Sequence, residues 1–99
     1  MRKSHVYITT TKRNTALYTG VTSNLVKRIH QHKTKFYKKS FSARYNCDKL
    51  VYFQEFADIR VAIAYEKKLK AGSRTKKENL INEMNPEWED LADGWVFDF

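Results

Sequence analysis

The sequence predicts a single mixed α/β (α+β) domain whose elements follow the order strand, strand, helix, strand, helix, helix. Residues 5–11 and 16–21 alternate side chains between two faces, as half-buried strands do. Residues 50–56 are apolar and aromatic on both faces, which indicates a strand covered on both sides. Three other segments begin with helix-capping residues and continue with apolar side chains at helical spacing. Because 99 residues can bury one modest core but not two, we expect one domain over residues 1–99.

The first two strands are expected to form an antiparallel hairpin. A polar turn at residues 12–14 separates them. In such a hairpin Tyr7 and Tyr18 point to the same face, where side chains of neighbouring strands interact. Gly20 would let another group approach the backbone closely. Taken alone, both tyrosines are ordinary strand residues.

The first helix is expected to begin at residues 22–24, which are all strong capping residues. Arg28 and His32 are four residues apart, so they project side by side at the margin of the buried stripe. Taken separately, Arg28 fits a surface charge and His32 a buried, hydrogen-bonded histidine. A loop follows to about residue 48. The expected buried stripe of this helix comprises Leu25, Ile29, His32 and Phe36.

Two more helices are expected after the third strand. Asp58 can cap the first of them, and Gly72 is placed to end it with a left-handed turn. Thr75 and Glu78 have the spacing of a capping box for the last helix. We place the domain core at about residues 4–91. The acidic and apolar tail, residues 92–99, is too apolar for a free linker and is expected to pack back on the domain.

Glu66 is the least expected residue of the second of these helices. It stands in the middle of an otherwise apolar stripe, where an ionised carboxylate is costly unless a cation, a metal ion or several donors meet it. Glutamate oxygens suit Mg²⁺. A salt bridge to a nearby lysine is the simpler alternative. The stripe comprises Ile59, Ala62, Ile63, Glu66 and Leu69.

The charge distribution predicts a polyanionic partner. The formal net charge is +8, but residues 83–99 hold six acids and no basic residue. Residues 1–82 therefore carry 19 basic and 5 acidic side chains, a formal charge of +14, which is a strong electrostatic signal for nucleic acid. Residues 24–47 contain no acid, and there aromatic side chains alternate with basic ones, as in surfaces that stack bases. A solubilising loop anchored by aromatics, or a surface for an acidic protein, is the alternative. The candidate DNA-binding residues are Lys27, Lys33, Lys35, Lys38, Lys39 and Arg44, interleaved with Phe36, Tyr37, Phe41 and Tyr45.

Several classes of protein are excluded by composition. Charges interrupt every apolar stretch, so we expect no membrane span, and no apolar signal segment follows the basic start at residues 1–3. The expected location is the cytoplasm. Cys47 is the single cysteine, which excludes an internal disulfide and a thiolate-rich zinc site.

The combined motifs resemble the GIY-YIG nuclease superfamily. Val6-Tyr7-Ile8 and Tyr18-Thr19-Gly20 are similar to its paired strand motifs. Arg28, His32 and Glu66 fall where the family keeps an arginine, a Tyr or His one turn later, and a glutamate. The stretches 17–33, 49–52, 66–70 and 85–88 resemble small stand-alone bacterial members, and the likeness spans about residues 4–91.

The resemblance implies a three-stranded antiparallel sheet flanked by helices and a DNA endonuclease site with one divalent metal, Mg²⁺ or Mn²⁺. It implies Tyr18 as general base toward water, Tyr7 as its supporting hydroxyl and Arg28 as the group that stabilises phosphoryl charge. His32 would assist proton movement or phosphate contact, and Glu66 would hold the metal. A role in DNA repair or recombination would fit.

Two positions depart from the family pattern. Val21 stands where many repair-type members have Lys after the second motif, and Glu89 stands where nucleases of the family often have Asn. Asn82 and Asn85 are the nearby substitutes for that amide. The alternative function is a nucleic-acid-binding module with the same fold and little or no catalysis.

Overall fold

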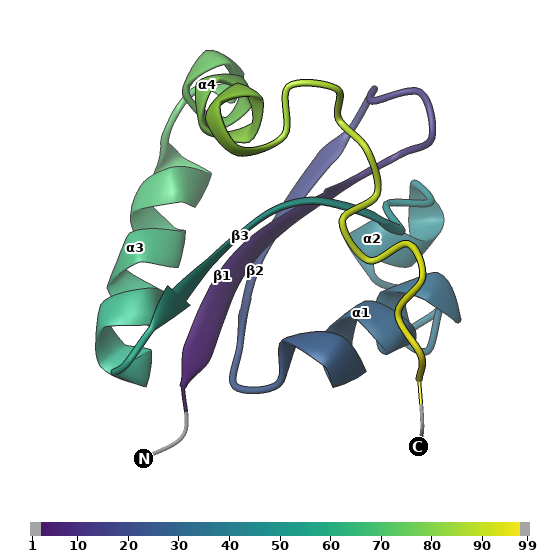
Figure 1. Ribbon diagram of the computed structural model, residues 1–99, viewed down its shortest axis with the longest axis horizontal. Coiled ribbons are helices and arrows are strands. Elements are labelled where there is room, and N and C mark those ends of the chain that lie inside the picture. The colour runs from purple at the N-terminus through teal and green to yellow at the C-terminus, as the bar shows by residue number, and fades with distance from the viewer. Residues whose placement is uncertain (1–2, 98–99) are drawn as a thin grey trace.

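A computed structural model describes residues 3–97 and confirms the predicted element order, with one short helix added (Figure 1). The strands form one antiparallel sheet in the order β2-β1-β3, with β1 in the centre. No helix within residues 3–97 is long and apolar enough to cross a membrane. The elements are β1 (Ser4–Thr10), β2 (Leu17–Thr22), α1 (Leu25–Lys33), α2 (Phe41–Arg44), β3 (Lys49–Phe56), α3 (Ile59–Ala71) and α4 (Arg74–Met84).

The register of the hairpin sets the positions of the two motif tyrosines. Tyr7 of β1 pairs with Gly20 of β2, and Thr9 pairs with Tyr18. Paired residues share a face of the sheet, and so do residues two apart on one strand. Tyr7, Tyr18 and Gly20 therefore lie on the same face, as the alternation of the two strands predicted.

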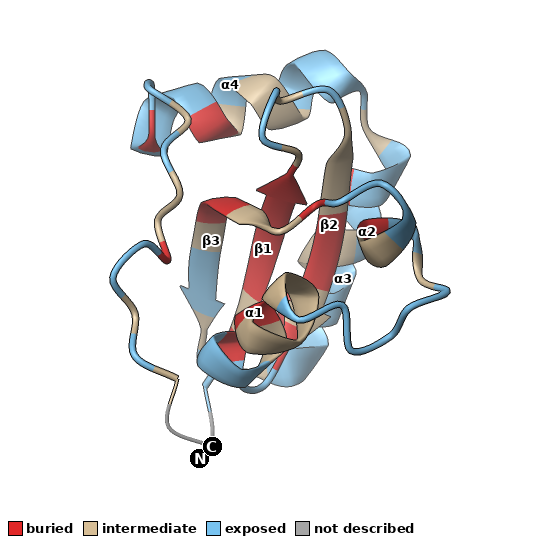
Figure 2. Ribbon diagram, turned by 90° about the vertical axis from the view of Figure 1, so that its right-hand side faces the viewer, coloured by how far each residue is buried: buried red, intermediate tan, exposed pale blue. Residues whose placement is uncertain are grey.

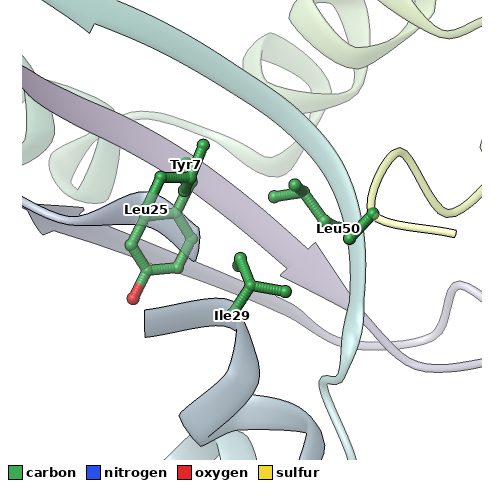
Figure 3. Packing of buried hydrophobic residues seen from close by; sticks show 5 residues of the cluster. Tyr7, Leu25, Ile29 and Leu50 are labelled. Carbon is green, nitrogen blue, oxygen red and sulfur yellow. The ribbon is translucent and has the colours of Figure 1, made fainter. Parts of the chain in front are cut away.

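The opposite faces of the central strand pack against different helices. Tyr7 contacts the α1 face, in a cluster with Leu25, Ile29 and Leu50 (Figure 3). Its neighbour Val6 points the other way, toward α3, and packs against that helix's buried residues. Figure 2 shows the buried residues concentrated along β1, between the helices. The sheet is thus covered on both faces, with α1 on the side that carries the two tyrosines.

The end of α1 differs from the prediction. Asn24 caps the helix start as expected, since its side chain accepts a hydrogen bond from the Lys27 N–H at 3.1 Å. The helix ends at Lys33, and Lys35 takes a left-handed conformation with φ of 55°. Phe36 therefore lies beyond the helix and is 64% exposed, so its predicted place on the buried stripe was wrong.

Two other predictions about helix ends were wrong, the conformation of Gly72 and the cap of the last helix. Gly72 does end α3, but its φ of −81° is an ordinary extended conformation and not a left-handed turn. Helix α4 is capped by Ser73, whose hydroxyl accepts the Lys76 N–H at 3.2 Å, so Thr75 lies inside the helix. Ser73 has the extended backbone that an N-cap requires, with φ of −73° and ψ of 161°.

The tail and the residues just before it pack on the domain, as predicted for the tail. The Asp90 carboxylate accepts hydrogen bonds from the Leu50 and Ala92 N–H groups, at 3.2 and 3.0 Å, and forms an ion pair with Lys33 at 2.5 Å. Ala92 is buried, and Trp95 and Phe97 pack against the same cluster as Tyr7. The tail therefore completes the core on the α1 side. Its last two positions, 98 and 99, lie outside the described residues, as do positions 1 and 2.

Candidate active site

The absence of a side chain at Gly20 makes room for Tyr7. A Cβ atom at position 20 would lie 2.4 Å from the Tyr7 hydroxyl oxygen and 2.5 Å from the ring carbon that carries it. The Tyr7 ring thus crosses the sheet directly over the Gly20 backbone. The prediction that Gly20 permits a close approach is confirmed, and the approaching group is Tyr7.

A line of hydrogen bonds starts at Tyr7 and crosses to the short helix α2. The Tyr7 hydroxyl lies 2.8 Å from His32 Nε2. His32 Nδ1 lies 2.5 Å from the Ser42 hydroxyl, which in turn donates to the Cys47 carbonyl oxygen at 2.9 Å. His32 is therefore a hydrogen-bonded histidine held between two elements, with one ring nitrogen toward each.

Burial shifts the pKa values of Tyr7 and His32. Burial, followed by the charge of Arg28, lowers the pKa of His32 to about 4, so its imidazole is neutral at pH 7. Burial and then the neighbouring Tyr18 raise the pKa of Tyr7, which Arg28 partly opposes. Tyr7 therefore stays protonated and His32 can accept its proton in a hydrogen bond.

A cleft opens above this pair, between α1 and the segment that leads into α2. Tyr18, Arg28 and His32 line it together with Lys35 and Ser40. The Tyr18 ring lies 5.2 Å from the His32 ring and 6.3 Å from the Tyr7 ring, between centroids. Four of the sequence-predicted site residues thus converge, three in the cleft wall and Tyr7 beneath it. A guanidinium, a phenol and a neutral imidazole facing one cleft can bind and orient a phosphodiester.

Glu66 approaches the site from the other helix layer, through Lys70. The Glu66 carboxylate is 12% exposed and forms an ion pair with Lys70 at 3.2 Å. The same Lys70 ammonium lies 6.0 Å from the centroid of the Tyr18 ring. The structure therefore shows the lysine salt bridge that the sequence left open as the alternative. Ile59 and Ile63 are both exposed, so the buried part of the predicted stripe is reduced to Ala62 and Leu69.

The donor set at Glu66 fits one mode of metal binding only. Among residues 3–97 no group of three or more His, Cys, Asp or Glu side chains gathers as metal ligands. Mg²⁺ is often held by one or two carboxylates, with water and substrate phosphate completing its shell. Glu66 can serve as such a single ligand, once its carboxylate is released from the Lys70 ammonium.

Three of the six candidate DNA-binding cations lie in the exposed segment between α1 and α2, and two more are exposed on those helices, whereas Lys33 is not exposed. Lys33 turns toward the tail, where its ammonium binds the Asp90 carboxylate and donates to the Asp48 carbonyl oxygen. Lys33 therefore holds the segment before the tail against the domain and is not available to DNA. The exposed basic residues of the set are Lys27, Lys35, Lys38, Lys39 and Arg44.

Large aromatic side chains stand exposed among these cations. Phe36 and Tyr37 contact each other edge to face, with centroids 4.9 Å apart. Phe41 lies between the Tyr45 ring at 4.6 Å and the Tyr18 ring at 6.3 Å. The aromatics therefore do not all anchor the loop to the core, and Phe41 stacks on Tyr18, which lines the cleft.

Val21, which departs from the family pattern, and Asn85, a possible substitute for the missing Asn, both have structural contacts away from the cleft. Val21 packs on the α3 side, with Val6 and Leu69, and so faces away from the two tyrosines. Asn85 is buried, and its amide donates to the Val51 and Glu89 carbonyl oxygens at 3.3 and 2.7 Å. It joins the segment after α4 to β3, and none of these hydrogen bonds involves a residue of the cleft.

Two residues of the site were missed by the sequence analysis, Ser42 and Lys70. Lys70 stands four residues after Glu66, a spacing that brings helix side chains together and would have identified it. Ser42 gave no such signal, because its partner His32 is ten residues away across a loop.

Comparison with known proteins accounts for this arrangement. Residues 3–79, which include both motif strands, α1 and α3, match the family described as the GIY-YIG catalytic domain. The chain belongs to the GIY-YIG family. It is 33% identical over 87 residues to a UPF0213 protein of Syntrophus aciditrophicus, an alignment that covers 88% of this chain and 98% of the relative. The solution structure of a UPF0213 protein from Bacillus halodurans is similar to it with a TM-score of 0.57 and 25% identity, over 96% of this chain and 99% of the other.

Membership of the GIY-YIG family supports a nuclease-type function. GIY-YIG nucleases bind nucleic acid as substrate and in general use a divalent metal ion, which the match does not specify further. The three-stranded antiparallel sheet with flanking helices is likewise the fold that the resemblance implied.

Proposed function

We propose that this protein is a metal-dependent DNA endonuclease that hydrolyses phosphodiester bonds, with a role in DNA repair or recombination. The observation that carries the proposal is the 2.8 Å contact between Tyr7 and His32 beneath a cleft lined by Tyr18 and Arg28. A purely structural tyrosine and histidine would not need an arginine in the same small cleft. Family membership and the basic surface around the cleft support the same conclusion.

Each cleft residue has a role that its surroundings favour. Arg28 offers a planar fork of donors to phosphate oxygens and stabilises the charge that develops on them. Tyr18 lines the cleft and is the proposed base: its hydroxyl would first pass its own proton to solvent, and the resulting phenolate would take the proton of the attacking water. Tyr7, which stays protonated, and the neutral His32 hold one another in place and orient Tyr18. The leaving oxygen then departs with a proton from solvent.

Glu66 is the proposed metal ligand. When bound, Mg²⁺ or Mn²⁺ would neutralise negative charge on the phosphate. In the protein alone, Lys70 supplies the positive charge at this carboxylate. When the metal binds Glu66, the Lys70 ammonium would leave this carboxylate and move toward Tyr18 or the DNA backbone. It already lies near the Tyr18 ring.

A cleavage panel tests this function. Purified protein is incubated with supercoiled, single-stranded and branched DNA in Mg²⁺, in Mn²⁺ or in EDTA, beside Tyr18→Phe and Arg28→Ala. We expect metal-dependent products from the wild type and a loss of at least about 100-fold in each variant, as expected for a proton-transfer group or a charge-stabilising group. Equal cleavage by wild type and both variants would reject the assigned site.

The second candidate is a DNA-binding module without useful catalysis. It is favoured by the Glu66–Lys70 ion pair, which engages the Glu66 carboxylate, and by the apolar Val21 at the position where many repair-type members of the family have Lys. This function predicts salt-sensitive DNA binding and no product with any metal or substrate of the panel. Binding that Glu66→Gln leaves unchanged, together with the absence of cleavage, would favour it over the endonuclease.

A further inference from the structure

The position of the proton on His32 follows from its hydrogen-bond partners. Ser42 is 3% exposed, and its hydroxyl oxygen lies 2.9 Å from the Cys47 carbonyl oxygen. A carbonyl oxygen can only accept, so the single hydroxyl proton of Ser42 is directed at Cys47. Toward His32 the same hydroxyl can then act only as an acceptor. His32 Nδ1, at 2.5 Å, must therefore carry a hydrogen.

The other ring nitrogen is fixed by this constraint. In a neutral imidazole with Nδ1–H, Nε2 has a lone pair and no hydrogen. The Tyr7 hydroxyl at 2.8 Å is then the donor to Nε2. The hydrogen bonds run in one direction, from Tyr7 through His32 and Ser42 to the Cys47 carbonyl.

Helix α2 holds the Ser42 hydroxyl in place. The Ser40 hydroxyl caps this helix by accepting the Ala43 N–H at 3.2 Å. The Cys47 N–H donates to the Ser42 carbonyl oxygen at 2.8 Å, so the two residues are joined by backbone and side chain. The short helix thus places one buried acceptor opposite His32 Nδ1.

We propose that Ser42 is a positioning residue of the site, whose hydroxyl selects the Nδ1–H tautomer of His32 and thereby makes Tyr7 the donor of the Tyr7–His32 hydrogen bond. With the Tyr7 proton directed at His32, the lone pairs of its oxygen remain for the Tyr18 side of the cleft. In the other tautomer, Nε2–H would donate to Tyr7 and the Tyr7 proton would turn toward the cleft. The choice of tautomer therefore decides whether Tyr7 presents an acceptor or a donor to its neighbours.

Nitrogen NMR of the histidine rings tests the tautomer directly, in the full-length protein at neutral pH. The wild type is expected to show His32 as the Nδ1–H form. In Ser42→Ala the buried Nδ1–H loses its acceptor, so we expect a shift of the population toward Nε2–H, while Ser42→Thr, which keeps the hydroxyl, retains the wild-type pattern. An Nε2–H form in the wild type, or an unchanged His32 pattern in a folded Ser42→Ala, would overturn the inference. If Ser42→Ala does not fold, the wild-type and Ser42→Thr spectra decide.

The consequence for turnover rests on the proposed function and has its own readout. We expect Ser42→Ala to lower kcat for DNA cleavage by about 10- to 100-fold at unchanged KM, by analogy with the loss seen when a metal-bound histidine loses its orienting partner. Ser42→Thr should restore it. If no protein cleaves DNA, the proposed function fails, while the NMR result still decides the tautomer. An unchanged kcat in Ser42→Ala with an altered tautomer would overturn the role of Ser42 in positioning.

Discussion

Gly20 and Tyr7 are paired across the β1–β2 ladder so closely that no side chain fits between them, since a Cβ at position 20 would lie 2.4 Å from the Tyr7 hydroxyl. Gly20→Ala must therefore displace a buried ring that His32 holds at its far end. We expect a loss of about 1–3 kcal/mol in the free energy of unfolding, as for overpacked cores. Cleavage should fall further, because a displacement of about 1 Å at a site can cost about 100-fold.

Gly72→Ala is the matched control for this change. At Gly72 a Cβ would meet its nearest neighbour, the Leu69 carbonyl oxygen, at 3.4 Å, and the φ of −81° suits alanine. Chemical denaturation of this variant should stay within about 0.5 kcal/mol of the wild type. Equal stability and equal activity of the two alanine variants would contradict the close contact at Gly20.

His32 makes stability depend on pH in a defined window. Its pKa is lowered from 6.5 to about 4 by burial and by Arg28, so the folded protein binds this proton less readily than the unfolded chain does. The stabilising contribution is fully present above pH 6.5 and is lost as pH falls toward about 4. Denaturation curves between pH 7 and pH 4 should therefore converge for wild type and His32→Gln, because the variant lacks this proton. A difference between the two proteins that does not change with pH would show that His32 titrates normally.

Asp90, just before the tail, is expected to stabilise the domain. Asp90→Ala removes the acceptor of the Leu50 and Ala92 N–H groups and the partner of Lys33. A buried hydrogen-bonding group left without a partner costs about 1–3 kcal/mol, so we expect a loss of that order in the free energy of unfolding. Asp93→Ala makes the same change of charge at an exposed tail position and should have little effect. Equal stability of the two variants would argue against the role of Asp90.

Exposed aromatics and cations between α1 and α2 should affect DNA binding in different ways. Phe36→Ala should weaken binding to single-stranded DNA by about 1–3 kcal/mol without changing its salt dependence, as loss of base stacking does. Lys38→Ala should reduce the slope of log affinity against log salt by about one unit. Fluorescence anisotropy across a salt series measures both.

The controls for these variants lie on the other side of the sheet. Val61→Ala and Lys67→Ala change an exposed apolar residue and an exposed cation of α3. Neither should alter affinity or slope. If the α3 variants weaken binding as much as the other two, the DNA surface has been assigned to the wrong face.

The parts of the structure that were predicted from sequence are those set by local patterns. Alternation along the hairpin placed Tyr7 and Tyr18 on one face, and Asn24 and Asp58 cap their helices as expected. The end of α1 was missed because Lys35 adopts a left-handed conformation that a lysine does not signal. Helix α2 was missed because four residues carry no periodicity.

The site was also predictable only in part, because local sequence patterns encode contacts within one helix but not contacts made across a loop. Arg28 and His32 are neighbours on one helix turn, so their proximity follows from spacing. The hydrogen bond between His32 and Ser42 depends on how the loop folds, which no short-range pattern encodes. For Glu66 the pattern identified a carboxylate in need of a partner but left a nearby, unidentified lysine and a metal ion as alternatives, and the structure shows Lys70 as the partner.

The rate of DNA cleavage by Glu66→Gln, measured beside the wild type in Mg²⁺ or Mn²⁺, tests the central claim most directly. The control is Glu78→Gln, which removes a similar ion pair, between Glu78 and Arg74 four residues apart on α4, away from the cleft. If Glu66 holds the metal of a GIY-YIG nuclease, metal-dependent cleavage is abolished in Glu66→Gln, retained in Glu78→Gln, and absent from the wild type in EDTA. Cleavage by Glu66→Gln at the wild-type rate would contradict the account.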